Sequence, residues 1–260
     1  MLNNKTNQTK SERFGGVERL HGTDAFAKLQ AAHVCVVGIG GVGSWVCESL
    51  ARCGVGEITL IDADDVCVTN INRQVHALSE TIGQEKVHAM SDRIKSINPD
   101  CVVHKQTTFF LETTAEKLLE PHYDFVVDAI DSIKHKSLLI TLCKQKDINM
   151  ITIGGAGGKV NIADIQVCDL GRSYDDRLLC KLRKELRNKY GFPRFKKKKF
   201  HVMCVFSPEM PRLPWCETDN IEEKTSLKLD CNNGFGTDVA VVSIFGITAA
   251  HYVVQWIIDN

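Results

Sequence analysis

The stretch Val36–Gly54, VVGIGGVGSWVCESLARCG, decides the fold. It starts at the end of an apolar run, carries four closely spaced glycines, and continues as an amphipathic segment. This order is typical of a strand, a tight turn and a helix, in which glycines let the backbone approach a phosphate and the helix start offers N–H donors. Alternatively, the glycines only permit close packing of the strand and the helix. The stretch predicts a nucleotide site without choosing the nucleotide.

The composition allows one large core and favours no charged partner. The chain has 260 residues, 43% of them hydrophobic, and its 32 basic residues balance 32 acidic ones. A single α/β domain commonly reaches about this size. Residues 1–12 lack the apolar run of a secretory signal, so we expect a cytoplasmic protein. The eleven cysteines are an odd number scattered along a long chain of intracellular character, which predicts reduced thiols, and they include no CxxC pair, which predicts no zinc.

Up to about Ile153, short apolar runs alternate with amphipathic segments, which predicts βα units and a doubly wound, Rossmann-like, mostly parallel sheet. Beyond it, VNIADIQVCDL and FHVMCVFS predict added strands. We expect one α/β domain in four parts. These are an N-terminal arm and helix (1–30), a nucleotide-binding core (31–160), added strands with a basic insertion (161–235) and an apolar C-terminal helix (236–260).

The apolar helix has a second interpretation. Residues 239–258, VAVVSIFGITAAHYVVQWII, carry no formal charge and are about long enough to cross a bilayer. Polar residues such as Ser243, His251 and Gln255 interrupt the run, and no Lys or Arg flanks its end. We expect a buried helix, and a membrane anchor is the alternative.

The residues after the second predicted strand extend the site toward a triphosphate. Asp62 ends that strand nineteen positions after Gly43, where an acid commonly binds ribose hydroxyls. Asn70 and Arg73 follow in DADDVCVTNINRQVHA, and Lys86 opens the next helix. Cations there would stabilise phosphate charge, which hydride transfer does not need. Taken singly, these residues are also explained as a solvated ion pair and a lysine on a helix surface.

Two acidic residues after the fourth predicted strand belong to the same predicted site. VVDAIDS places Asp128 and Asp131 at the end of the fourth predicted strand, and ligands bind at this edge of open α/β sheets. A carboxylate there can hold Mg²⁺. Together with the cations, it predicts a site that cleaves a nucleoside triphosphate.

Several motifs resemble those of the adenylating enzymes related to ubiquitin activators, which activate a carboxylate with ATP. They are GxGGxGS, DxDxVxxxNxNRQ, GxxKVxxMxxRIxxINP and DAIDS. RFGGVERLHG, DDVCVTNINRQVHAL, TIGGAGG and DCNNGFGTD are most similar to the tRNA threonylcarbamoyladenosine dehydratase branch, and they extend the likeness over nearly the whole chain. The resemblance implies ATP-dependent cyclisation of threonylcarbamoyladenosine in tRNA, through adenylation of the threonyl carboxylate.

The resemblance also implies a role for each motif residue. The glycines line the phosphates, Asp62 binds ribose, and Asp131 holds magnesium. In a homodimer, Arg13 of ERFGG reaches the neighbouring active site. The expected catalytic residues are Arg13, Arg73, Lys86 and Asp131, and the expected nucleotide-binding residues are Gly38, Gly40, Gly41, Gly43, Asp62, Asn70, Arg73, Lys86 and Asp131.

Other functions stay open at this stage. Activators of small sulfur-carrier proteins belong to the same superfamily but usually hold zinc with two CxxC pairs, which this sequence lacks. Cys231 in LDCNNGFG is either a functional thiol or a buried structural cysteine. A nicotinamide oxidoreductase would bind NAD over ATP, and a non-catalytic scaffold would leave the cations without a purpose. A sulfur-transfer partner protein is also left open.

The segment from residue 172 to 199 is a candidate tRNA-docking surface. It carries twelve Lys or Arg against three acids, a net charge of +9. We expect an amphipathic helix with Leu178, Leu182 and Leu186 on its buried stripe, followed by aromatics that stack on loop bases, Phe192, Phe195 and Phe200. A solvated charge run is the alternative. The candidate tRNA-binding residues are Lys181, Lys184, Arg194, Lys196, Lys197, Lys198 and Lys199.

Overall fold

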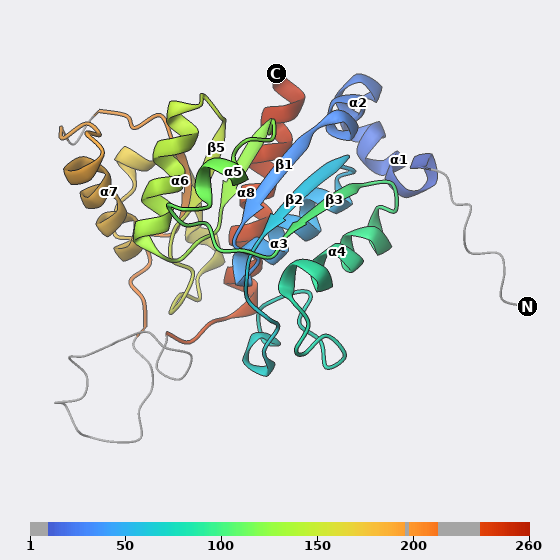
Figure 1. Cartoon of the computed structure of the whole chain (residues 1–260), viewed down its shortest axis with the longest axis horizontal. Coiled ribbons are helices and arrows are strands. Elements are labelled where there is room, and N and C mark those ends of the chain that lie inside the picture. The colour runs from blue at the N-terminus through green and yellow to red at the C-terminus, as the bar shows by residue number, and fades with distance from the viewer. Residues whose placement is uncertain (1–9, 196–197, 213–234) are drawn as a thin grey trace, which may run out of the picture.

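The computed structural model describes residues 10–195, 198–212 and 235–260. These residues form a seven-stranded sheet in the order β3-β2-β1-β4-β5-β7-β6 (Figure 1). All neighbouring strands are parallel except β6 and β7, which are antiparallel. The predicted doubly wound, mostly parallel sheet is therefore confirmed, and the added strands lie at one edge. The strands are β1 (His33–Val37), β2 (Glu57–Ile61), β3 (Val102–Gln106), β4 (Phe125–Asp128), β5 (Met150–Ile153), β6 (Gln166–Asp169) and β7 (Met203–Phe206).

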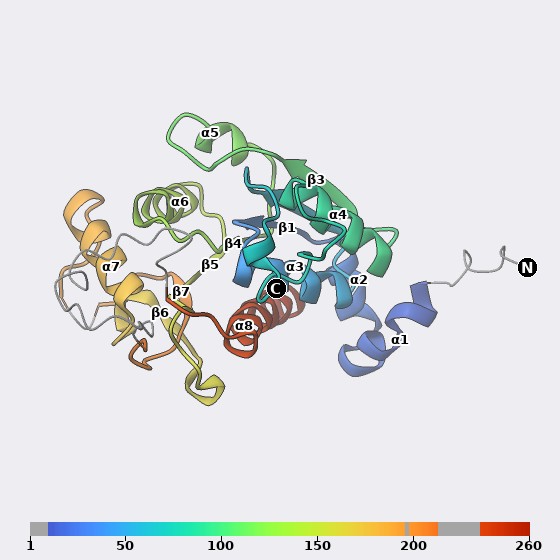
Figure 2. The ribbon, with the colours of Figure 1, turned by 90° about the horizontal axis from the view of Figure 1, so that it is seen from below.

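Helices cover both faces of the sheet (Figure 2). Alternate strand residues point to opposite faces, so Val34 and Val36 enter one core while Cys35 and Val37 enter the other. The first core is closed by α2 (Thr23–Ala31), α3 (Gly41–Arg52), α4 (Lys86–Ile97) and α8 (Val239–Asp259). The second is closed by α5 (Ala115–Leu118), α6 (Ile133–Gln145) and α7 (Arg177–Lys189). Helix α1 (Lys10–His21) packs on α2, and short 3-10 turns occupy Val68–Asn70, Ile162–Asp164 and Leu170–Arg172.

The apolar segment near the C-terminus forms α8, which packs along α3. The Asp238 side chain starts the helix by accepting a hydrogen bond from Ala240 N. Gly246 permits the close approach, because a Cβ there would lie 2.6 Å from Val42 O. By length and composition α8 could also cross a membrane, but half of its most apolar window is buried inside the protein.

Candidate active site

A cavity of about 1080 Å³ opens at the carboxyl ends of the parallel strands. Val37, Ile61 and Ile153, the last residues of β1, β2 and β5, lie in its wall. The chain leaves β1 and β4 in opposite directions, so the cavity is at the topological switch point of the sheet, where such folds bind ligands. Its volume is at the upper end of the range of small-molecule sites and is sufficient for a nucleotide.

The glycine turn forms one wall of the cavity, and its glycines differ in role. Gly38, Gly40 and Gly41 line the cavity. Gly38 has a positive φ of 90°, which favours glycine. Gly40 is the N-cap of α3 and has no side chain to cap the helix, so the first N–H groups of α3 are available to an anion.

Gly43 lies behind this wall and is not among the lining residues. A Cβ at this position would lie 1.8 Å from Gly38 O. Glycine here lets α3 pack against the end of β1, which is the alternative role that the sequence left open. Its predicted contact with phosphate stays a prediction.

Asp62 and Lys86 both line the cavity at the ends of neighbouring elements, β2 and α4. Asp62 Oδ2 accepts a hydrogen bond from Ile39 N at 2.6 Å, and its Oδ1 accepts one from Asp64 N at 2.9 Å. Burial raises the pKa of the Asp62 carboxyl, and the neighbouring Lys86 opposes this shift. Lys86 Nζ lies 2.6 Å from Asp64 Oδ2 and 4.0 Å from Asp62 Oδ1. Because Lys86 is buried at the cavity wall, its interpretation as a lysine on a helix surface is wrong.

Arg73 and Asn70 line the same cavity as the glycine turn. Arg73 Nη1 donates to Thr69 O at 2.6 Å and to Asn72 Oδ1 at 2.9 Å. Its carbonyl accepts from Trp45 Nε1 of α3 at 3.0 Å, which ties this segment to the helix that follows the glycine turn. Both predicted residues line the cavity, so the structure brings them together with the glycines.

The two predicted acids after β4 have different surroundings. Asp128 is fully buried, pairs with Lys136 Nζ at 2.9 Å and accepts from Thr152 Oγ1 at 2.6 Å. Burial raises the pKa of Asp128, and Lys136 opposes this shift. Its Oδ1 accepts from Ile130 N at 3.1 Å and so shapes the turn that presents Asp131 to the cavity. Asp131 is exposed and is the acid of this pair that a ligand can reach.

A buried ion pair in another wall of the cavity was not predicted from the sequence. Lys159 Nζ lies 3.1 Å from Asp176 Oδ2 and donates to Ser207 O at 2.7 Å. Asp176 also accepts from Gly155 N and caps α7 through Leu179 N. Both charged residues line the cavity. The signal was the position of Lys159 directly after TIGGAGG, at the same sheet edge as the other predicted residues.

Helix α7 begins at the cavity, and its buried stripe differs from the predicted one. The buried leucines are Leu179, Leu182 and Leu186, while Leu178 is half-buried and lines the cavity beside Lys181. Leu182 and Leu186 are buried as predicted, and Leu179 takes the place of Leu178 because positions i, i+3 and i+7 share a narrower face of a helix than positions that are all four apart. Lys181, a predicted tRNA-binding residue, therefore lies at the cavity, and Lys184 is exposed one turn further along the helix.

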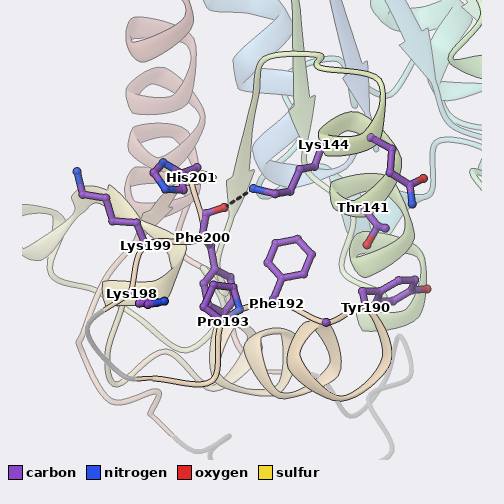
Figure 3. A pocket seen from close by; sticks show the side chains of 11 residues that line it. Thr141, Lys144, Tyr190, Phe192, Pro193, Lys198, Lys199, Phe200 and His201 are labelled. Carbon is purple, nitrogen blue, oxygen red and sulfur yellow. Dashed lines mark hydrogen bonds between the residues drawn. The ribbon is translucent and has the colours of Figure 1, made fainter.

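The segment after α7 encloses a second, smaller pocket of about 460 Å³ (Figure 3). Phe192 and Phe200 pack on each other there, with ring centroids 5.1 Å apart, and both are buried. Their predicted stacking on RNA bases is therefore wrong, whereas Phe195 is 75% exposed. Lys144 of α6 donates to Phe200 O at 3.0 Å. The exposed residues Lys198 and Lys199 also line this pocket, Arg194 is exposed nearby in the chain, and Lys196, Lys197 and Cys231 fall outside the described residues.

Arg13 is placed apart from the cavity of its own chain. It belongs to α1, and its Nη1 donates to Ile97 O at the end of α4, at 3.2 Å. Its predicted role in the site of a neighbouring subunit stays a prediction.

The geometry agrees with the comparisons to known proteins. The ThiF family matches residues 16–260 of this sequence. The chain belongs to the ThiF family. It is 47% identical over 244 residues to the tRNA threonylcarbamoyladenosine dehydratase of Haemophilus influenzae, across 94% of this chain and 92% of that protein. The resemblance found in the sequence motifs is thus confirmed.

Solved structures extend the likeness to three dimensions. The crystal structure of the Escherichia coli tRNA N6-threonylcarbamoyladenosine dehydratase in complex with ATP is similar with a TM-score of 0.86 and 41% sequence identity, over 96% of this chain and 95% of that chain. The structure of the same Escherichia coli protein in complex with AMP gives the same values. The fold predicted from the sequence is therefore shown along nearly the whole of its length.

Proposed function

We propose that this chain is an ATP-dependent dehydratase that cyclises threonylcarbamoyladenosine in tRNA. The observation that carries the proposal is the cavity at the sheet edge, where the glycine turn, Arg73, Lys86 and Asp131 surround one volume. The full-length likeness to dehydratases, and to a structure containing ATP, supports the same nucleotide and substrate.

The reaction has two steps, and neither step needs a nucleophile from the protein. The threonyl carboxylate oxygen attacks the α-phosphorus of ATP, and the bond to pyrophosphate breaks. The carbamoyl oxygen of the same modified base then attacks the activated acyl carbon, its nitrogen loses a proton, and AMP leaves with the former carboxylate oxygen. Ring closure is intramolecular, so it needs positioning more than it needs a covalent intermediate with the protein.

Each wall of the cavity has a part in the first step. The N–H groups at the start of α3 and the Arg73 guanidinium stabilise charge on the phosphates. Lys86 is held by Asp64 and Asp62, which keeps its ammonium at the wall while Asp62 remains placed for ribose. The Lys159–Asp176 pair fixes the opposite wall and the start of α7.

Asp131 would hold Mg²⁺, which would neutralise charge on the phosphates when it is bound. The residue fits this ion because it is an exposed carboxylate on the cavity wall, and Mg²⁺ is commonly bound by one or two carboxylates together with substrate phosphates.

The tRNA would lie along α7. This helix has thirteen residues and is about 20 Å long. It runs from the cavity, at Lys181, toward the lysines of the smaller pocket, Lys198 and Lys199. We place the protein in the cytoplasm as a homodimer in which Arg13 completes the partner's site. No observation favours the sulfur-carrier alternative.

The direct test is mass analysis of tRNA nucleosides after incubation of substrate tRNA with the protein and ATP. We expect threonylcarbamoyladenosine to lose the mass of one water, with one AMP released per product. Omission of ATP is the control. Pyrophosphate exchange that requires an added sulfur-carrier protein, with no change in the nucleoside, would contradict the proposal.

A further inference from the structure

Three side chains of types that can ligate a metal lie together toward the amino ends of neighbouring strands, and none of them lines the nucleotide cavity. The three strands, β1, β2 and β3, lie side by side in Figure 1. His33 is the first residue of β1, Glu57 is the first of β2, and His104 lies in β3. In the sheet register His33 pairs with Glu57, and Thr59 pairs with His104. Residues two apart on a strand share a face, so all of these side chains project from the same face of the sheet.

The donor atoms converge within the reach of one ion. Glu57 Oε1 lies 2.7 Å from His104 Nε2 and 3.5 Å from His33 Nδ1. One ligand atom from each of the three residues lies within 4.8 Å of the others. Zinc bonds to nitrogen and oxygen are about 2.0–2.2 Å, which places neighbouring ligands of a tetrahedral site about 3.3 Å apart. Small rotamer shifts of the exposed His104 are enough to reach this arrangement.

The surroundings orient the His33 ring toward the cluster. Its Nε2 is hydrogen-bonded to Thr59 Oγ1 at 2.8 Å, which turns Nδ1 to Glu57. Such a contact to the outer ring nitrogen is the usual support of a metal-binding histidine. The ring also packs edge-on against Tyr123 at 4.8 Å, and its side chain is only 13% exposed. Rigid strands and a fixed ring make this a largely preformed site.

We propose that His33, Glu57 and His104 bind one divalent transition-metal ion of the zinc class, with water in the remaining coordination positions. Two imidazoles and one carboxylate favour zinc over magnesium or calcium, which prefer oxygen ligands. The proposal opposes the expectation of a zinc-free protein, which considered only cysteine pairs. The ion would join the ends of three adjacent strands and would stabilise the fold without entering the nucleotide site.

Titration of the metal-stripped full chain with ZnCl₂ at fixed neutral pH tests the site. We expect one zinc per chain by calorimetry, unaffected by excess MgCl₂. At a hundredfold excess over Kd, the Tm should rise by about 5–10 °C, since the ion binds only the folded state. His104→Ala should abolish both effects, and this variant should fold because its side chain is 45% exposed.

His88→Ala is the matched control. His88 is 50% exposed and lies 3.1 Å from Glu85, so it also forms a histidine–glutamate pair on the surface but is not part of the cluster. This variant should bind zinc and gain thermal stability as the wild type does. The proposal would be overturned if His104→Ala bound one zinc per chain and gained the same Tm as the wild type. It would also be overturned if the wild type showed no saturable zinc binding.

Discussion

Alanine substitutions at Gly43 and Gly40 separate the two roles of glycine in the turn after β1. A Cβ on Gly43 would lie 1.8 Å from Gly38 O, which belongs to the backbone and cannot rotate away. Real Cβ contacts are essentially never shorter than 3.0 Å, so α3 would have to move from β1 by more than about 1 Å. Such a shift disturbs Val46 and Leu50, which are fully buried.

We expect Gly43→Ala to lower the free energy of unfolding by about 3 kcal/mol or more, the upper end of typical overpacking costs. Gly40→Ala should lower it by less than about 1 kcal/mol, because no atom of the described residues lies within 4 Å of the added Cβ and its φ is negative. The same open space belongs to the cavity, so the methyl group of Gly40→Ala should weaken ATP binding. Urea unfolding and calorimetric titration with ATP measure the two effects.

Equal unfolding free energies for Gly43→Ala and the wild type would refute the packing argument. If folded Gly40→Ala bound ATP with the affinity of the wild type, the prediction that Gly40 lies next to the bound phosphates would be wrong.

Four further predictions concern charged groups. Asp176→Asn should lower the free energy of unfolding by about 3–5 kcal/mol, because it leaves the buried Lys159 without its charged partner. The control Glu116→Gln, which breaks a surface pair with Lys146, should change it by less than about 1 kcal/mol. Equal urea midpoints for the two variants would contradict the prediction. Burial lowers the pKa of His76 to about 4, below its usual 6.5, so the unfolded state takes up the proton first and the free energy of unfolding should fall by about 3 kcal/mol as pH drops between these values. His76→Leu should remove that slope, and an unchanged slope would show that another group titrates. Asp131→Asn should slow pyrophosphate release by about 10²–10³-fold at unchanged Tm. A wild-type rate would contradict the proposal that Asp131 holds the metal ion. Mixed Arg13→Ala and Asp131→Asn chains should regain activity in heterodimers, and no regain at any mixing ratio would argue against a shared site.

The turn from β1 into α3 could be predicted because its signals are local. Apolar residues, glycines and an amphipathic segment follow one another within a single stretch of chain. The contact between Lys159 and Asp176 could not be found in this way, since it depends on how α7 docks beside the strand end. The same holds for His33 and His104, whose meeting depends on the sheet register. In α7, the even four-residue spacing of Leu178, Leu182 and Leu186 misled the prediction at its first position, because Leu179 is the residue that completes the i, i+3, i+7 pattern of a buried helix face.

The packing of α8 against α3 makes the order of synthesis matter. Chains emerge from the ribosome with the N-terminus first, so the glycine turn and α3 exist long before α8 is made. Until Gly246 can pack against Val42, the part of α3 that contacts α8 stays exposed. A nascent chain that stalls before α8 would therefore present a hydrophobic surface to chaperones, beside an incompletely packed glycine turn. Packing of the glycine turn would then depend on a helix that is translated much later along the chain.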